Sequence, residues 1–359
     1  MSRALQLAKR GLYTTCPNPR VGCVLVKEGE IIGEGWHEVV GGPHAEINAL
    51  NHAGPVAKGS ICYVTLEPCS HSGKTPPCTG ALIGAGISKV IAAMSDPNPE
   101  VSGSGFALLS TAGIDTESGL METESRSLNP GFIKRMTQQV PYVRCKLAMS
   151  LDGRTAMDNG ESKWITGTAS RNDVQRLRAE SCAIMTGIGT VLADDPRLDI
   201  REPGLNGRQP LRVVLDRRLR FPETAAMLKQ SGRTLIFTLN PDAKRKEELT
   251  KAGAEVIAMQ IQVERFSEEV LRFLAQQEKI NEILLEAGAG LSGDMLQSGL
   301  VDELIVYQAP VLLGDMAKGL FYLPELKNMK DKIDLELIDV RHVGNDLRFL
   351  LKPRVPKNG

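Results

Sequence analysis

The segment between His44 and Cys78 holds the residues whose types and spacing could do chemistry. His44 and Glu46 lie two positions apart, and Cys69 and Cys78 each follow a proline. One imidazole and two thiolates are three ligands of the kind that zinc takes at catalytic sites, where water fills the fourth position. Zinc lowers the pKa of that water to near neutral, so hydroxide becomes available as a nucleophile. Glu46 is then close enough to move the water's protons.

The order of these residues fits the H-x-E…P-C-x-x-C signature of zinc deaminases that act on nucleobases, with one departure. Eight residues separate Cys69 from Cys78, where the signature has two. We predict that His44, Cys69 and Cys78 bind one zinc ion. We predict that Glu46 is catalytic, taking a proton from water and delivering one to the departing amine. The alternative is a closed structural site with a fourth ligand such as His71, but such a site has no use for the carboxylate.

These side chains need elements that bring them together. We expect a helix over 43–53, a strand over 61–66 that runs into Cys69, and a helix over 78–85. Helix starts also favour the thiolate form of nearby cysteines. Around them the sequence predicts a helix at 2–11 and paired strands at 21–26 and 31–36. A strand at 89–94, a helix near 103–112 and a strand near 114–120 follow. Helices packed on a sheet make an α/β layered domain.

A chain of 359 residues is long enough for two cores. We place a boundary between 131 and 141, which gives domains over 1–140 and 141–359. The second domain opens with a strand at 142–149. Further strands are expected, with helices between them, near 183–186, 211–215, 234–238, 254–259, 282–286 and 303–309. This alternation predicts a second α/β domain.

Composition excludes several classes of function. Lysine plus arginine and aspartate plus glutamate both number 43, so there is no whole-chain electrostatic footprint for nucleic acid or an anionic membrane. Aromatic residues make up 4%, which argues against a nucleic-acid deaminase with an RNA-docking domain. No apolar stretch approaches a membrane span. We therefore expect a cytoplasmic enzyme with no nucleic-acid or membrane partner. Cys23, Cys62 and Cys145 lie in apolar runs typical of strands, so we expect buried, reduced thiols there.

Several segments, in this order, resemble the bifunctional riboflavin-biosynthesis deaminase/reductase family across nearly the whole chain. They are residues 17–23, 67–78, 150–154, 162–166 and 301–304. Each motif alone is weak, but together they are specific. The resemblance implies a three-layer, cytidine-deaminase-like N-terminal domain, then a dihydrofolate-reductase-like α/β domain. It also implies a homo-oligomer, a dimer or larger, formed through the reductase domain.

The resemblance implies two reactions. The first domain would deaminate 2,5-diamino-6-(ribosylamino)-4(3H)-pyrimidinone 5′-phosphate, and the second would reduce the ribosyl side chain of the product to ribityl with NADPH. Asn18 would bind the pyrimidine and Lys74 would face the ribose phosphate. As alternatives, Asn18 is a turn residue between two prolines and Lys74 is a solvated loop lysine.

We do not predict a Rossmann site in the second domain. Two glycine-bearing junctions, at 186–191 and 286–293, each follow an apolar strand and open a helix, where a phosphate can approach backbone N–H groups. One such junction is usually a plain turn, but two, joined to the family resemblance, favour dinucleotide binding. By resemblance the NADPH-lining positions are Ala148, Trp164, Thr190, Asp194, Gly288, Ala289, Gly290, Leu291, Ser292, Gly293 and Asp294.

By the same resemblance the substrate positions of the second domain are Ser162, Arg178, Leu198, Arg201 and Glu286. A guanidinium group forks phosphate oxygens, so Arg178 and Arg201 suit the 5′-phosphate, with ion pairing as the alternative. Lys146 and Asp152 flank the strand end and are candidate polar anchors.

Two alternative functions stay open at this point. One is a zinc deaminase of another nucleobase substrate with an accessory second domain. The other is a zinc-stabilised metabolite-binding regulator without turnover. The second would have lost Glu46 or a zinc ligand, and all four residues are present.

Overall fold

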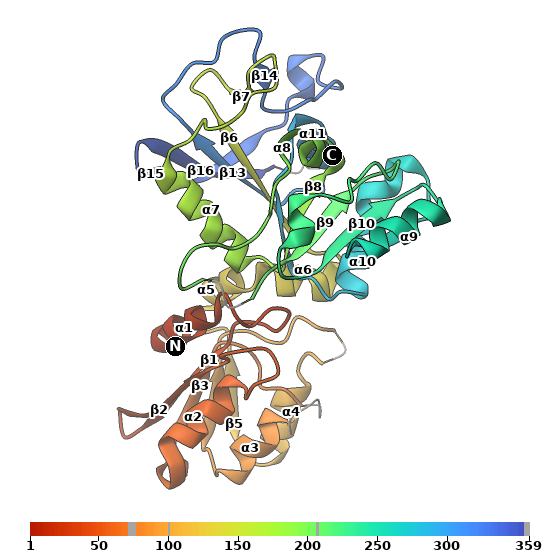
Figure 1. The fold of residues 1–359 in the computed structure, drawn as a ribbon. Helices are drawn as coiled ribbons and strands as arrows, with labels where there is room; N and C mark the ends of the chain where they lie inside the picture. The colour runs from red at the N-terminus through yellow and green to blue at the C-terminus, as the bar shows by residue number, and fades with distance from the viewer. Residues whose placement is uncertain (71–76, 100, 206–207, 355–359) are drawn as a thin grey trace. The chain divides into compact units, whose positions relative to one another are not determined.

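The computed structural model describes residues 1–70, 77–99, 101–205 and 208–354 (Figure 1). Backbone contacts divide the chain into two units, Met1–Val140 and Pro141–Gly359. The predictions for His71 and Lys74 lie outside the described residues. Across the described part of the chain, no helix has the length and apolar character needed to cross a membrane.

The first unit is built on a five-stranded sheet with the order β2-β1-β3-β4-β5. Strand β1 pairs antiparallel with β2 and β3, whereas β3, β4 and β5 run parallel. The strands are β1 (Gly22–Lys27), β2 (Glu30–Trp36), β3 (Ile61–Val64), β4 (Lys89–Ala92) and β5 (Asp115–Ser118). The helices are α1 (Ser2–Ala8), η1 (Lys9–Gly11), α2 (Ala45–Ala53), η2 (Gly54–Ala57), α3 (Cys78–Gly84), α4 (Ser104–Thr111), α5 (Glu122–Leu128) and α6 (Pro130–Gln138).

Alternation along β1 explains why both faces of this sheet are covered. Cys23 and Leu25 pack in the core with residues of α2, α3 and α4. Val24 points the other way and packs with Ala4 and Leu7 of α1. Successive side chains of a strand face opposite sides, so one apolar strand supports a helix layer on each face. The expected three-layer α/β fold is confirmed.

Glycines on β2 bring α2, and with it the candidate site, close to the sheet. A Cβ at Gly35 would lie 2.4 Å from the Ala45 oxygen and 2.4 Å from the Ala49 nitrogen, and a Cβ at Gly33 would lie 2.5 Å from the Ala49 oxygen. Alanines at 45, 49 and 53 form the buried face of α2. Only small residues on both elements allow the backbones of α2 and β2 to approach this closely. The glycines of β2 therefore help to position α2, which carries His44 at its start.

The second unit is built on a nine-stranded sheet with the order β11-β10-β9-β8-β12-β6-β13-β16-β15. Its strands are β6 (Tyr142–Met149), β8 (Ala183–Gly187), β9 (Leu211–Leu215), β10 (Thr234–Thr238), β11 (Glu255–Ala258), β12 (Glu282–Leu285), β13 (Glu303–Gln308), β15 (Leu335–Val343) and β16 (Asp346–Pro353). A separate ribbon pairs β7 (Arg154–Ala156) with β14 (Lys318–Gly319). The helices are α7 (Thr168–Glu180), α8 (Ile188–Asp194), η3 (Ala226–Lys229), α9 (Ala243–Lys251), η4 (Val263–Arg265), α10 (Phe266–Gln276), α11 (Ala289–Gln297) and η5 (Met329–Asp331).

Helices cover both faces of this sheet as well. Ile236 of β10 packs with residues of α8 and α9, whereas its neighbour Phe237 meets Phe273 of α10 with 5.3 Å between ring centroids. The seven strands from β11 to β13 are mutually parallel, so their carboxyl ends meet at one edge of the sheet. The predicted second α/β domain is confirmed.

The C-terminal hairpin was not predicted from the sequence. Strands β15 and β16 pair antiparallel with each other, and β16 adds antiparallel to β13. The pairing of β15 shifts register between Leu337 and Asp339, so its apolar and polar residues break the period-two alternation that marks a half-buried strand. Because of this irregularity, the sequence pattern did not predict the hairpin at the edge of the sheet.

Candidate functional site

The predicted zinc ligands of the first unit lie together. One ligand atom from each of His44, Cys69 and Cys78 can be chosen so that all lie within 4.8 Å of one another. His44 is the N-cap of α2 and Cys78 is the first residue of α3, while Cys69 follows β3. His44 Nδ1 lies 3.2 Å from Cys78 Sγ and 3.6 Å from Cys69 Sγ. The elements expected from the sequence therefore bring three distant residues to one point.

The cluster fits zinc by distance and by donor type. Tetrahedral bonds of about 2.0 Å to nitrogen and 2.3 Å to sulfur hold an imidazole nitrogen and a thiolate about 3.6 Å apart, close to the separations found. The hydrogen bond between the two thiols lowers the pKa of Cys69 to about 4 and raises the pKa of Cys78. A lowered pKa favours the thiolate form of Cys69, which is the form in which cysteine binds zinc.

Glu46 lies in the first turn of α2 and is 4% exposed. Burial raises its pKa to about 7. Its carboxyl group interacts with the side chain of Cys78, so Glu46, two residues after the ligand His44, lies beside the cluster. Sequence analysis predicted this proximity from the two-residue spacing.

His37 connects the cluster to Asn18, a link that sequence analysis missed. Its ring lies edge-on to that of His44 with 5.5 Å between centroids. His37 Nε2 lies 3.0 Å from Asn18 Nδ2, and Nδ1 lies 3.0 Å from the Pro43 oxygen. Burial lowers the pKa of His37, so the ring stays neutral beside a cation site. Sequence analysis gave His37 no role, since nothing in the spacing of positions 18, 37 and 44 signals that these residues meet.

Glu67 anchors the chain just before Cys69. Its buried carboxylate accepts hydrogen bonds from the backbone N–H groups of Asp96 at 2.9 Å, Gly103 at 3.0 Å and Gly105 at 2.9 Å. A Cβ at Gly105 would lie 2.2 Å from the Pro68 oxygen. The segment before Cys69 is therefore held against the start of α4 by hydrogen bonds and close packing. Sequence analysis assigned no role to the Glu67 carboxylate.

In the second unit, three predicted polar residues form a buried charge cluster: Lys146 of β6, Arg178 of α7, and Glu286 directly after β12. Glu286 accepts two hydrogen bonds from Arg178, at 2.6 and 3.0 Å, and lies 3.3 Å from Lys146 Nζ. Burial opposes ionisation of Glu286, but Arg178 and Lys146 outweigh it and hold its pKa at about 2. Glu286 thus holds Arg178 and Lys146 in place at the predicted substrate site of the second unit.

Asp199 joins the two arginines that were predicted to bind phosphate. Arg178 donates to the Asp199 backbone oxygen at 3.0 Å, and Arg201 Nη1 lies 2.5 Å from Asp199 Oδ1. Arg201 is half-exposed and can turn toward a ligand, whereas Arg178 is buried and held by Glu286. Leu198 is 2% exposed and packs in the core, so any contact it makes with substrate is through its backbone.

The predicted cofactor residues gather around the starts of α8 and α11. A Cβ at Gly187 would lie 3.2 Å from Leu291, and a Cβ at Gly288 would lie 4.0 Å from Thr190, so the two glycine junctions are neighbours. Asp194 accepts a hydrogen bond from Ser162 at 3.4 Å. The remaining members of the predicted run are the first residues of α11, Ala289, Gly290, Leu291, Ser292, Gly293 and Asp294.

Trp164 is 70% exposed, with the Arg171 guanidinium 4.7 Å above its ring. A side chain this exposed is not part of the core. Ala148 lies on β6, opposite Tyr307 of β13. The structure thus keeps Trp164 available to a ligand.

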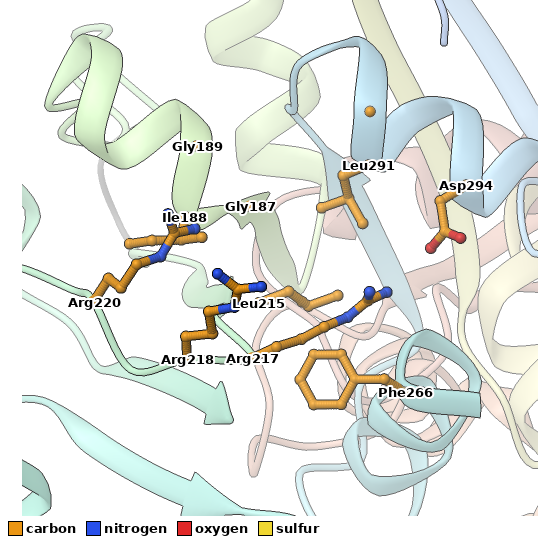
Figure 2. Close-up of a pocket in the computed structure, with 11 residues that line it drawn as sticks. Gly187, Ile188, Gly189, Leu215, Arg217, Arg218, Arg220, Phe266, Leu291 and Asp294 are labelled. Carbon is orange, nitrogen blue, oxygen red and sulfur yellow. The ribbon is translucent and has the colours of Figure 1, made fainter. Parts of the chain in front are cut away.

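A pocket of about 420 Å³ lies beside these junctions (Figure 2). Leu215, Ile188 and Leu291 contribute apolar surface, and Phe266 contributes an aromatic ring. Arginines from the turn after β9 line the same pocket. Sequence analysis had assigned Leu291 and Asp294 to this region but not the arginines.

Comparison with known proteins accounts for both units. Residues 1–94 match the cytidine and deoxycytidylate deaminase zinc-binding region, and residues 141–349 match the RibD C-terminal domain. The riboflavin biosynthesis protein RibD of Escherichia coli K12 is 48% identical over 366 residues, covering 97% of this chain and 96% of that protein.

Solved structures agree over the whole length. Acinetobacter baumannii RibD, form 1, has a TM-score of 0.92 and 46% identity, and the match covers 99% of this chain and 98% of that one. A diaminohydroxyphosphoribosylaminopyrimidine deaminase/5-amino-6-(5-phosphoribosylamino)uracil reductase from Thermotoga maritima has a TM-score of 0.88 and 34% identity, covering 99% and 97%. The chain therefore belongs to the RibD family of bifunctional riboflavin-biosynthesis deaminase/reductases.

Proposed function

We propose that this chain carries out two consecutive steps of riboflavin biosynthesis. The first is hydrolytic deamination of 2,5-diamino-6-(ribosylamino)-4(3H)-pyrimidinone 5′-phosphate. The second is NADPH-dependent reduction of the ribosyl side chain to ribityl. The observation that carries the proposal is the convergence of His44, Cys69 and Cys78 within 4.8 Å beside a buried Glu46, in a chain that matches RibD proteins over nearly its full length.

In the first unit, His44, Cys69 and Cys78 would hold zinc, which as a Lewis acid makes water ionise near neutral pH. Glu46 takes a proton from the attacking water and passes it to the exocyclic amino group, which leaves as ammonia. Asn18 holds the pyrimidine, and its bond to His37 orients its amide. Lys74 stays a prediction as the partner of the ribose phosphate.

A catalytic zinc site differs from a structural one because it leaves the fourth coordination position open for water. Among the described residues, three metal-binding side chains meet at the cluster and Glu46 lies beside them. A closed site would bury a fourth ligand there instead. The donor set and the buried carboxylate together support catalysis over a purely structural role.

In the second unit, bound NADPH would supply a hydride to the anomeric carbon of the open-chain imine form of the substrate, and a proton would complete the amine. Arg201 and the cations held by Glu286 would bind the anionic substrate, with Ser162 and the backbone of Leu198 completing the contacts. The glycine junctions at the starts of α8 and α11 admit the dinucleotide. Trp164 and Asp194 would close the nicotinamide end.

The test is to incubate zinc-loaded protein with the diaminopyrimidine ribosyl phosphate, with and without NADPH. Ammonia release without NADPH, followed by NADPH oxidation only after deamination, is the expected result. Ammonia release without any oxidation would reject the reductase half. The absence of both ammonia release and NADPH oxidation would reject the proposed substrate. The chain would then belong, by its first unit, to the wider class of zinc nucleobase deaminases.

We further propose that the reductase unit self-associates. Strand β15 is the edge of the nine-stranded sheet, and its side chains Leu337, Ile338 and Val340 are exposed. An exposed apolar edge strand invites pairing with another chain. Light scattering on the purified protein should give a mass above one chain, and Val340→Lys should lower it.

A further inference from the structure

Three arginines on one short turn line the pocket of the second unit. Arg217, Arg218 and Arg220 follow β9 directly and reach over the pocket between the starts of α8 and α11 (Figure 2). The sequence-based assignment of the cofactor site included none of them. Their position raises the question of what anion they bind.

The turn that displays these arginines is anchored on both sides. The buried carboxylate of Asp216 accepts a hydrogen bond from the Phe221 N–H at 2.8 Å, and its backbone oxygen accepts one from the Leu219 N–H at 3.1 Å. Leu219 has a φ of 55° and packs in the core. Because Leu219 points inward, Arg218 and Arg220 on either side of it stay exposed.

The positive charge of this turn is poorly compensated. Among the described residues, neither Arg217 nor Arg218 forms an ion pair, and Arg220 only approaches Asp216 at 4.0 Å. Arg217 lies against the ring of Phe266, with 5.8 Å from its guanidinium carbon to the ring centroid. Three neighbouring like charges repel each other, so an anion with more than one charge would relieve the repulsion.

The pocket's place on the sheet indicates which part of the cofactor reaches it. The strand order β9-β8-β12-β6 puts the turn three strands from Ala148 on β6, where the nicotinamide is predicted. Three strand spacings amount to about 14 Å, which an extended dinucleotide can bridge. The adenosine half would then lie in this pocket, against the apolar side chains Leu215 and Leu291.

We propose that Arg217, Arg218 and Arg220 bind the 2′-phosphate of NADPH and set the preference of the reductase for NADPH over NADH. A 2′-phosphate carries up to two negative charges, and guanidinium groups donate forked hydrogen bonds to its oxygens. NADH has a neutral hydroxyl at that position and gains nothing from the turn. The inference rests on the proposed reductase function and names the residues that make it specific.

The experiment is calorimetric titration of the full-length, zinc-loaded protein with NADPH, NADH, 2′,5′-ADP and 5′-ADP. The variants are R217A, R218A, R220A and the conservative R218K. R233A is the matched control, because Arg233 is a half-exposed arginine of the same unit that pairs with Glu255 and Glu278, outside the pocket. Circular dichroism melting confirms that each variant is folded.

Each alanine variant should weaken NADPH and 2′,5′-ADP by about tenfold, the effect of one charge-assisted hydrogen bond, and leave NADH unchanged. R218K should retain part of the preference for NADPH, and R233A should retain all of it. Equal losses for NADPH and NADH, or for 2′,5′-ADP and 5′-ADP, would overturn the inference by placing the turn at the shared pyrophosphate. Unchanged binding of all four ligands would also overturn it. A wild-type protein that binds neither NADPH nor NADH would instead reject the reductase function itself.

Discussion

His44 and Cys78 each stand at the beginning of a helix, and His44 Nδ1 lies 3.2 Å from Cys78 Sγ. Cys78 follows His44 by 34 positions in the chain. Helix starts carry partial positive charge, which stabilises a nearby thiolate. The meeting of two helix starts therefore brings together two of the three predicted zinc ligands.

Cys78→Ala should lose zinc, because it removes one of three protein ligands. The measurement is zinc content per chain by mass spectrometry, together with the melting temperature of the first unit. Cys62→Ala is the control, since Cys62 is a buried free thiol of the same core. That control should keep its zinc. Unchanged zinc in the Cys78 variant would show that the ligand set is wrong.

Gly35→Ala should shift α2 away from β2, because the new Cβ would lie 2.4 Å from backbone atoms of Ala45 and Ala49. We expect a loss of about 1–3 kcal/mol in the free energy of unfolding, and weaker zinc binding as His44 moves with its helix. Gly84→Ala on α3 is the control, since a Cβ there meets nothing within 4 Å. If both variants bind zinc equally, the α2 contact does not position the site.

Glu286→Gln should destabilise the second unit by about 3 kcal/mol, because Arg178 and Lys146 would be left without their buried carboxylate. The folded-state pKa of Glu286, about 2, lies below its ordinary value of 4.5. Its stabilisation is thus complete above pH about 4.5 and is lost as pH falls toward 2.

Hydrogen exchange of β12 peptides across this pH range measures the effect. The wild-type protein should lose protection in acid more steeply than the Glu286 variant. Glu278→Gln removes an ion pair with the half-exposed Arg233 and should change protection little. Identical acid profiles for wild type and the Glu286 variant would argue against a stabilising charge cluster.

Arg201→Ala should raise the reductase KM for phosphorylated substrate by about tenfold while leaving KM for the dephosphorylated analogue unchanged. Arg197→Ala is the matched control, since Arg197 pairs with the same Asp199 at 3.3 Å and was not predicted to bind substrate. An equal effect of Arg201→Ala on both substrates would mean that the phosphate lies elsewhere.

The local order of elements from α1 to β5 was predictable from the sequence because most of these strands and helices have their own apolar pattern and stop signals, whereas α5 and α6 were not predicted. The turn at 27–30 lies between β1 and β2, and α2 carries His44 at its start as expected. The fold class of both units is confirmed. The hairpin of β15 and β16 was missed because its irregular register obscures the alternation on which such predictions depend.

The zinc cluster was predictable because its residue types are restricted by chemistry and its motif is local. Contacts that depend on tertiary packing were not. Glu67 binds N–H groups 29 to 38 residues away, and His37 meets Asn18 across the start of the unit. Likewise, the arginines after β9 read as ordinary charged loop residues until the sheet order places them beside α8 and α11.

The measurement that tests the account most directly uses Glu46→Gln, which should retain zinc but lose deamination by about 100-fold or more. Given the diaminopyrimidine ribosyl phosphate and NADPH, this variant should release no ammonia and oxidise no NADPH. Given the deaminated pyrimidine, it should oxidise NADPH at the wild-type rate. Near-normal ammonia release by the variant, or failure to reduce the deaminated compound, would contradict two separate sites acting in sequence.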